Sequence, residues 1–187
     1  ASQSGQSLSA LTATEEVTEL RSAWSPEGMR LAYVAHGREG CEVRLRTVFV
    51  DAEALTARQV ATGTGANDRL IASCSPFDIQ LAWHPNGEDV FFNRRPFAHG
   101  PLRIYAVNVR SGRIREITQV NEGVVGDIAF SLSREGEKLA VLRTAHWNQS
   151  ELWVYDLSNK TTQRLHQFPY WIHSLSWNND ASALYFS

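Results

Sequence analysis

The chain has 187 residues, of which 43% are hydrophobic and 20% charged, and it contains six Trp and eight Phe. This length and composition predict a single globular domain with an apolar core and exclude a disordered chain. The formal net charge of −2 argues against a nucleic-acid-binding module, which is normally basic, and no apolar stretch approaches the roughly 18 residues that a membrane span requires.

The N-terminal segment, ASQSGQSLSA, lacks the charged and apolar regions of a signal peptide, and the only methionine of the chain is Met29. We therefore expect the chain to be a processed or excised piece, with any targeting or membrane segment outside it. Near this end, SLSALT resembles the later GRIREIT, which predicts an outer strand over residues 6–12 that precedes the first repeat.

A short unit that begins as WSPEGMRLAYV at Trp24 occurs four times along the chain. The other copies are WHPNGEDVFFN from Trp83, LSREGEKLAVL from Leu132 and WNNDASALYFS from Trp177. Their alignment brings together Gly28, Gly87, Gly136 and Ala181, at intervals of 59, 49 and 45 residues. Pro and Gly in the turns, with apolar and aromatic residues on both sides, predict a strand, a tight turn and a second strand in each copy.

The residues that follow each copy also repeat, at an offset of 48 residues that places Ile104 on Leu152 and Tyr105 on Trp153. The turns in these segments are RSGR and SNKT, so two further strands are predicted and each unit is a sheet of four antiparallel strands, a to d. The first copy of this part, from Cys41, is longer and looser. We interpret residues 61–78, ATGTGANDRLIASCSPFD, as an insertion between the first two units.

Four-stranded antiparallel units that recur every 45 to 50 residues are typical of β-propeller blades, because one such sheet cannot bury both of its apolar faces alone. A β-sandwich with accidental internal similarity is the alternative. The sequence thus predicts an all-β, incomplete propeller. Its expected parts are the outer strand at 6–12, a first blade at 20–61, a second at 79–118, a third at 127–166, and the first two strands of a fourth at 173–187.

The incomplete fourth blade leaves two interpretations of the ring. We expect the natural protein to continue into further blades, whereas an outer strand that pairs with the last blade would close a four-bladed ring. An open arrangement exposes apolar faces and strand edges at both ends of the stack. It therefore predicts self-association through the open blade edges.

Strand direction alternates within a blade, so the b–c and d–a connections are expected at one end of the sheets. These connections contain aromatic residues beside cations, a composition typical of interaction sites. We therefore expect a recognition face for a protein or a small ligand, and the alternative is that the aromatic rings fill gaps between blades. The candidate residues are Arg94, Arg95, Phe97, His99, His146, Trp147, Tyr170 and Trp171.

The sequence contains no motif of an enzyme or of a cofactor site. There is no Gly-x-Ser-x-Gly, His-Glu-x-x-His or phosphate-binding glycine loop, and the six His are scattered without metal-ligand spacing. We therefore expect neither catalysis nor a cofactor nor a metal. For Cys41 and Cys74, two free thiols are the favoured interpretation; a disulfide requires an oxidising compartment and a Cα separation below about 7 Å.

The segments AWSPEGMRLAYVAHGREG, AWHPNGEDVFFNRR and RIYAVNVRSGRIREIT resemble the TolB-like (WD-like) propeller repeat. The resemblance covers nearly the whole chain and is specific for the fold. The third copy departs from the repeat, with Leu132 and Arg134 where Trp and Pro are usual, and the fourth copy lacks both Pro and Gly.

Repeats of this type occur in TolB, in the gating propellers of prolyl-oligopeptidase-type serine peptidases, and in the extracytoplasmic part of membrane-anchored transcriptional regulators similar to CadC. Here the repeats begin almost at once, which resembles the region after the membrane span of the CadC-like regulators. The resemblance thus implies a non-enzymatic, periplasmic sensor or protein-interaction propeller anchored by a span outside this chain. A peptidase-gating propeller and a TolB-like periplasmic scaffold are the alternatives, and this part of the protein is not expected to contact nucleic acid.

Overall fold

The computed structural model describes residues 18–38, 40–51, 56–58, 68–75, 79–146 and 148–187. These residues form sixteen strands and no helix, so this part of the chain has no helix that could span a membrane. The alternation of apolar and polar residues and the frequency of β-branched and aromatic residues explain why strands form throughout.

Three sheets each have four antiparallel strands in the expected a–b–c–d order. The first sheet contains β1 (Thr18–Trp24), β2 (Arg30–Gly37), β3 (Gly40–Thr47) and β6 (Asp68–Cys74). The second contains β7 (Leu81–Trp83), β8 (Asp89–Arg94), β9 (Arg103–Asn108) and β10 (Ile114–Glu116). The third contains β11 (Gly126–Leu132), β12 (Lys138–His146), β13 (Gln149–Asp156) and β14 (Thr161–Phe168).

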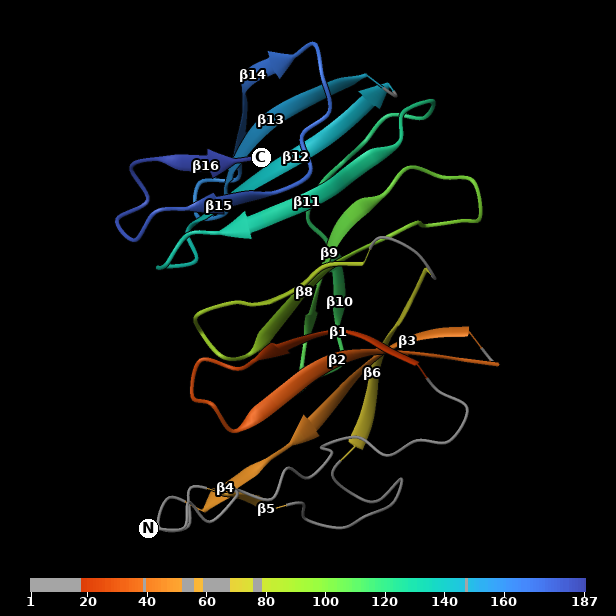
Figure 1. The fold of residues 1–187 in the computed structure, drawn as a ribbon, viewed down its shortest axis with the longest axis vertical. Coiled ribbons are helices and arrows are strands. Elements are labelled where there is room, and N and C mark those ends of the chain that lie inside the picture. The colour runs from red at the N-terminus through yellow and green to blue at the C-terminus, as the bar shows by residue number, and fades with distance from the viewer. Residues whose placement is uncertain (1–17, 39, 52–55, 59–67, 76–78, 147) are drawn as a thin grey trace, which may run out of the picture.

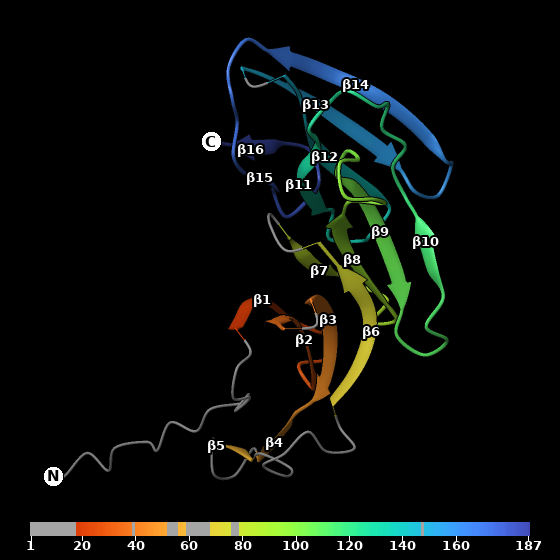
Figure 2. The same ribbon diagram turned by 90° about the vertical axis from the view of Figure 1, so that its right-hand side faces the viewer.

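Two smaller pairs complete the described strands. β15 (Leu175–Trp177) and β16 (Leu184–Phe186) lie beside the third sheet, and β4 (Phe49–Asp51) and β5 (Thr56–Arg58) form a hairpin of their own. The sheets follow one another along the long axis of the molecule (Figure 1), and Figure 2 shows the same succession from the side. The structure is therefore an all-β, incomplete propeller, as the repeat predicts.

The four a–b turns are structurally equivalent, as their alignment predicts. In each turn the fourth residue has a positive φ and donates its backbone N–H to the carbonyl three residues earlier, over 2.8 to 3.2 Å. The φ values are +75° at Gly28, +68° at Gly87, +76° at Gly136 and +56° at Ala181. Glycine adopts this conformation freely, so the fourth copy keeps the turn at some cost in backbone strain.

The boundary expected for the first blade is wrong in one respect. The sequence interpretation placed all four strands before residue 62 and took residues 61–78 as an insertion, but the fourth strand is β6, within that segment. β6 pairs with β3 from Cys41 opposite Cys74 to Arg46 opposite Asp68. Asp68 accepts a hydrogen bond of 2.6 Å from the Tyr33 hydroxyl, a long-range contact that no local pattern indicates. The outer strand predicted at 6–12 lies outside the described residues.

The core consists of apolar layers between successive sheets. One cluster joins the first and second sheets around Trp83 and Phe92, and another joins the second and third around Phe91 and Phe130. A third cluster, which includes Ile172, lies between the third sheet and β15. Because Phe91 and Phe92 are adjacent in β8, their side chains point to opposite faces, so one strand contributes to two layers. This explains why each blade needs a neighbour on both sides.

Candidate recognition face

The b–c and d–a connections lie along one edge of the stacked sheets. In Figure 1 the a–b turns line the left edge, whereas the connections after β2, β8 and β12 and those that lead into β11 and β15 reach the opposite edge. This is the arrangement expected from alternating strand directions. We call the second edge the recognition edge, and it contains the candidate residues that follow.

Arg94, the last residue of β8, and Arg95, the first residue of the β8–β9 connection, are both held in place by contacts. The Arg94 guanidinium lies over the ring of Tyr105, 4.5 Å from its centroid, and Arg95 donates a hydrogen bond of 2.6 Å to the carbonyl of Gly100. The Phe97 ring covers Gly100, where a Cβ atom would lie 3.0 Å from the ring. Phe97 is nevertheless 53% exposed and His99 is exposed beside it, so this loop presents an aromatic side chain on a fixed backbone.

The connection between β14 and β15 forms a second aromatic group. Tyr170 and Trp171 are 54% and 40% exposed, and the Trp171 ring stacks on His173 with 5.3 Å between centroids. Beneath them, Phe168 and Ile172 are buried in the layer between the third sheet and β15. The buried pair fills the gap between blades. Tyr170 contacts the Phe168 ring, with 5.6 Å between centroids, and both Tyr170 and Trp171 remain partly exposed.

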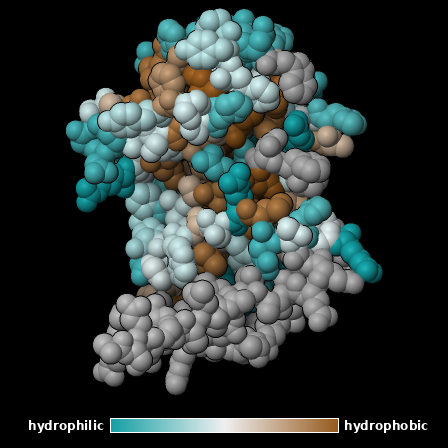
Figure 3. Space-filling model, viewed as in Figure 1, coloured by the Kyte–Doolittle hydropathy of each residue, from teal (hydrophilic) through white to brown (hydrophobic). Residues whose placement is uncertain are grey.

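The β12–β13 turn contributes the remaining candidates. His146 is exposed at the end of β12, and Trp147 lies outside the described residues. The candidates thus come from three connections along one edge, after β8, β12 and β14. On the face seen in Figure 3, hydrophobic residues reach the surface as patches among hydrophilic ones.

A buried ion pair near the start of β11 was missed by the sequence reasoning. Asp127 is completely buried, and its Oδ1 atom lies 2.7 Å from Nε of Arg143, which also donates a hydrogen bond of 2.9 Å to the Tyr155 hydroxyl. Burial raises the pKa of Asp127 despite this partner. The pair connects β11 with β12, and a lone Asp at the start of a strand gives no sequence signal for it.

Cys41 and Cys74 are joined by a disulfide, with 4.9 Å between their Cα atoms. The favoured interpretation, two free thiols, is therefore wrong. They are directly opposite in the β3–β6 pair, and Cys41 lies next to the β2–β3 connection. The error has the same cause as the misplaced strand, because only the pairing of β6 with β3 brings these residues together.

Among the described residues, no three His, Cys, Asp or Glu side chains are close enough to hold a metal ion. The features that remain at the edge are aromatic surfaces, imidazoles and guanidinium groups. Such groups bind by contact area, stacking and hydrogen bonds.

Four-stranded antiparallel sheets that stack through apolar layers, with equivalent turns at one edge, define a β-propeller. Solved structures with this fold are similar to the chain. TolB from Acinetobacter baumannii has a TM-score of 0.65 and 15% identity, over 91% of this chain and 37% of that one. A putative TolB from Agrobacterium tumefaciens has a TM-score of 0.60 and 17% identity, over 87% and 51%. A puromycin-hydrolyzing peptidase from Mycobacterium tuberculosis has a TM-score of 0.62 and 22% identity, over 85% and 23%.

These similarities support a TolB-like propeller and show the fold alone. The chain spans about half or less of the length of each of these proteins. No protein-family model matches the chain, and no curated protein sequence matches it either.

Proposed function

We propose that the chain is a non-enzymatic recognition propeller that binds a protein or a small ligand at its recognition edge. The observation that carries this proposal is the exposure of Phe97, Tyr170 and Trp171 above a fixed backbone. Exposed aromatic side chains are costly to keep in water and are enriched at the centres of interfaces. Binding would bury them without reorganising the sheets beneath.

We further propose an extracytoplasmic location, as the sensor part of a CadC-like membrane-anchored transcriptional regulator. The disulfide between Cys41 and Cys74 supports an oxidising compartment. In this role the bound and free states must differ in free energy at the end of the propeller that faces the membrane.

A gating propeller of a prolyl-oligopeptidase-type serine peptidase is the second candidate, favoured by the similarity to the puromycin-hydrolyzing peptidase. A TolB-like scaffold is the third. The parent gene separates them: a winged helix and an apolar segment upstream support the regulator, whereas a Gly-x-Ser-x-Gly motif downstream supports the peptidase.

The recognition edge itself is tested by affinity capture from an extracytoplasmic extract of the source organism. The baits are the wild-type protein, Phe97→Ser with Trp171→Ser, and the control Gln163→Ser on the exposed part of β14. We expect quantitative mass spectrometry to find proteins that are retained by the wild type and the control and depleted at least tenfold by the double variant. Equal retention by all three baits contradicts the proposal.

A further inference from the structure

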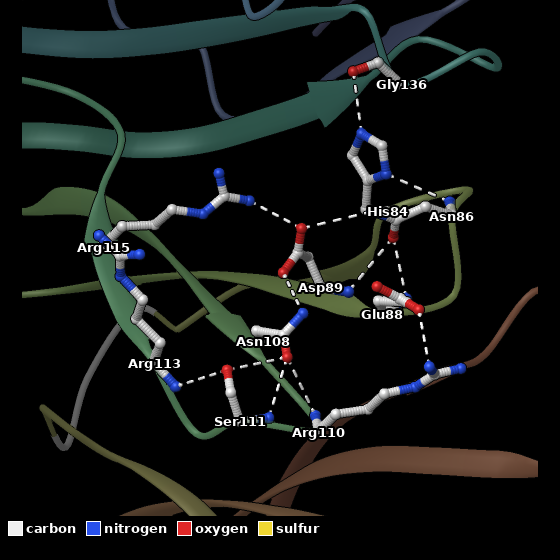
Figure 4. A network of polar contacts seen from close by, with 10 residues as sticks. All are labelled: His84, Asn86, Glu88, Asp89, Asn108, Arg110, Ser111, Arg113, Arg115 and Gly136. Carbon is white, nitrogen blue, oxygen red and sulfur yellow. Dashed lines mark hydrogen bonds and ion pairs between the residues drawn. The ribbon is translucent and has the colours of Figure 1, made fainter.

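A groove of about 1150 Å³ lies between the second and third sheets, away from the candidate residues above. One wall is formed by Arg115 and Ile117, in and just after β10. The opposite wall is formed by Trp153 and Tyr155 of β13 and by the turn and first residues of β14. His84 and Gly136 close one end, where His84 Nε2 lies 3.1 Å from the Gly136 carbonyl oxygen (Figure 4).

The groove contains a cation that is held in place and still available. Nη2 of Arg115 lies 2.7 Å from Oδ2 of Asp89, whose side chain is only 11% exposed, whereas the Arg115 side chain is 48% exposed. Asp89 is fixed in turn by Asn108 Nδ2, 3.2 Å from Oδ1. Figure 4 shows the Arg115 guanidinium reaching from β10 to Asp89 with its other terminal nitrogen directed elsewhere. A guanidinium has five N–H donors, so one partner leaves donors for a second carboxylate.

Among the described strands, β10 has one edge without a partner, and this edge provides backbone groups beside the cation. β10 is the outer strand of its sheet and pairs with β9. The carbonyl of Arg113 and the N–H of Ile117 both bond to β9, so the antiparallel alternation directs the N–H and C=O groups of Ile114 and Glu116 away from it. An extended segment can therefore pair with this edge, as in strand addition.

Size and charge decide the class of ligand. The groove is larger than the roughly 300–1000 Å³ of ordinary small-molecule pockets, and partly buried Ile117, Trp153 and Leu157 give it apolar walls. The lining has more carboxylates than cations, which disfavours a run of acidic residues and leaves room for one. The carboxylates are Asp89, Glu116, Glu135, Glu137 and Asp156, and the cations are Arg115, Arg143 and Lys160. The best match is a segment with one carboxylate facing Arg115 and apolar side chains beside it.

We propose that this groove binds an extended peptide segment of a partner protein, with one Asp or Glu side chain of the segment paired to Arg115. This site is separate from the recognition edge, so it adds a second contact to the proposed function and does not depend on it.

The probe is a phage-displayed library of random decapeptides selected on the wild-type protein, followed by calorimetry on the selected peptides. We expect the peptides to carry an Asp or Glu, and Arg115→Gln to weaken binding at least tenfold, which corresponds to about 1.4 kcal/mol. The matched control Arg113→Gln removes an exposed arginine that does not line the groove and is expected to change the affinity less than twofold.

A second variant distinguishes loss of the binding site from loss of folding, in case Arg115→Gln does not fold. Thr162 is exposed and lies opposite Tyr155, so its side chain is on the groove side, and Thr162→Trp should fill the groove and abolish peptide binding without removing a charge. Selection of no peptide, or peptides that bind both variants as tightly as the wild type, would overturn the proposal. The proposal would also be overturned if N-acetyl-aspartate bound to the protein as tightly as the selected peptides, because the carboxylate alone would then account for the affinity. Trp171→Ser should leave peptide affinity unchanged, which keeps this test independent of the recognition edge.

Discussion

At Gly126, a single backbone position joins two sheets. The Leu102 N–H donates to the carbonyl of Val125 and the Leu102 carbonyl accepts from the N–H of Asp127, both over 2.9 Å. A Cβ atom on Gly126 would lie 2.3 Å from the backbone N and O atoms of Leu102, and the φ of Gly126 is +109°. Only glycine allows the second and third sheets to approach this closely.

We therefore expect Gly126→Ala to lower the free energy of unfolding by more than about 3 kcal/mol, because backbone atoms must move apart. Gly123→Ala is the matched control: its φ is +85°, but no atom lies within 4 Å of the added Cβ. Strain alone should cost the control about 1–2 kcal/mol. Urea unfolding measures both, and equal losses would show that the close approach is unimportant.

Three tyrosines with raised pKa values are expected to make the folded protein less stable at alkaline pH. Burial, followed by the hydrogen bond to Asp68, raises the pKa of Tyr33 above its ordinary value of 10.0. Burial also raises the pKa values of Tyr105 and Tyr155. These groups stay protonated in the folded state at pH values where the unfolded chain already loses its phenolic protons.

The direction of the change in unfolding free energy with pH follows from the linkage between proton binding and folding. Below pH 10 the tyrosines are protonated in both states, and above it the unfolded state binds fewer protons, so stability falls as the pH rises. Each tyrosine contributes up to about 1.4 kcal/mol per pH unit. Urea unfolding between pH 9 and 11, with absorbance at 295 nm, should show this fall, and Tyr33→Phe should reduce its slope. Stability that is constant over this range would contradict the argument.

At the scale of elements, the third blade shows how a departure from the repeat is compensated. In the second and fourth copies, the indole N–H of Trp83 or Trp177 donates to the preceding sheet, to the carbonyls of Ala23 and Ser131 over 2.9 and 3.1 Å. The third copy has Leu132 at this position. Instead, the Gln80 side-chain amide makes two hydrogen bonds to the backbone of Phe130. The Phe130 N–H donates to Gln80 Oε1 over 2.8 Å, and Gln80 Nε2 donates to the Phe130 carbonyl over 2.9 Å.

Gln80→Leu should therefore weaken the contact between the second and third sheets. It leaves the N–H and C=O groups of Phe130 without these partners, which we expect to cost about 2–4 kcal/mol of unfolding free energy. Gln163→Leu, the same change on the exposed β14, should cost less than about 0.5 kcal/mol. Thermal unfolding of the two variants checks this, and a similar small effect in both would show that Gln80 is dispensable.

The disulfide holds β6 in the first sheet across a long connection. Cys41 and Cys74 are 33 residues apart in sequence, and closing a loop of this length in the unfolded chain corresponds to about 3–4 kcal/mol. We expect Cys41→Ala with Cys74→Ala to lose about this amount, and a reducing agent to destabilise the wild type but not the double variant. An unchanged urea midpoint in reduced wild-type protein would contradict the estimate.

At the scale of the whole molecule, the described strands leave two open ends. Tyr185 and Phe186 of β16 are exposed, and Trp24 and Leu20 of β1 are exposed at the other end of the stack. Exposed apolar strands beside unpaired backbone edges favour association with another chain.

We therefore predict that this 187-residue chain self-associates at high concentration. Sedimentation velocity over a hundredfold concentration range should show a rising mean mass. Tyr185→Lys with Phe186→Lys should shift the association to higher concentration, whereas Leu165→Lys on β14 should not. A stable monomer of the wild type across the range would reject the prediction.

The sequence alone determined what depends on near neighbours along the chain. Turn residues at fixed places, alternating apolar strands and the repeat at 48 residues predicted the sheets, and the left-handed turns at Gly28, Gly87 and Gly136 confirm the alignment. The position of the exposed aromatic groups at one edge could also be predicted, because alternating strand directions place their loops there.

Only the tertiary structure decided which distant segments meet. The membership of β6 in the first sheet, the disulfide, the groove and the Gln80 hydrogen bonds all join residues far apart in sequence, where no local preference distinguishes one partner from another. The repeated tryptophan makes the same point: Trp83 is buried against the preceding sheet, whereas Trp24, with no preceding sheet among the described strands, is exposed. The residue type is set by the repeat, but its burial is set by the sheet that packs against it.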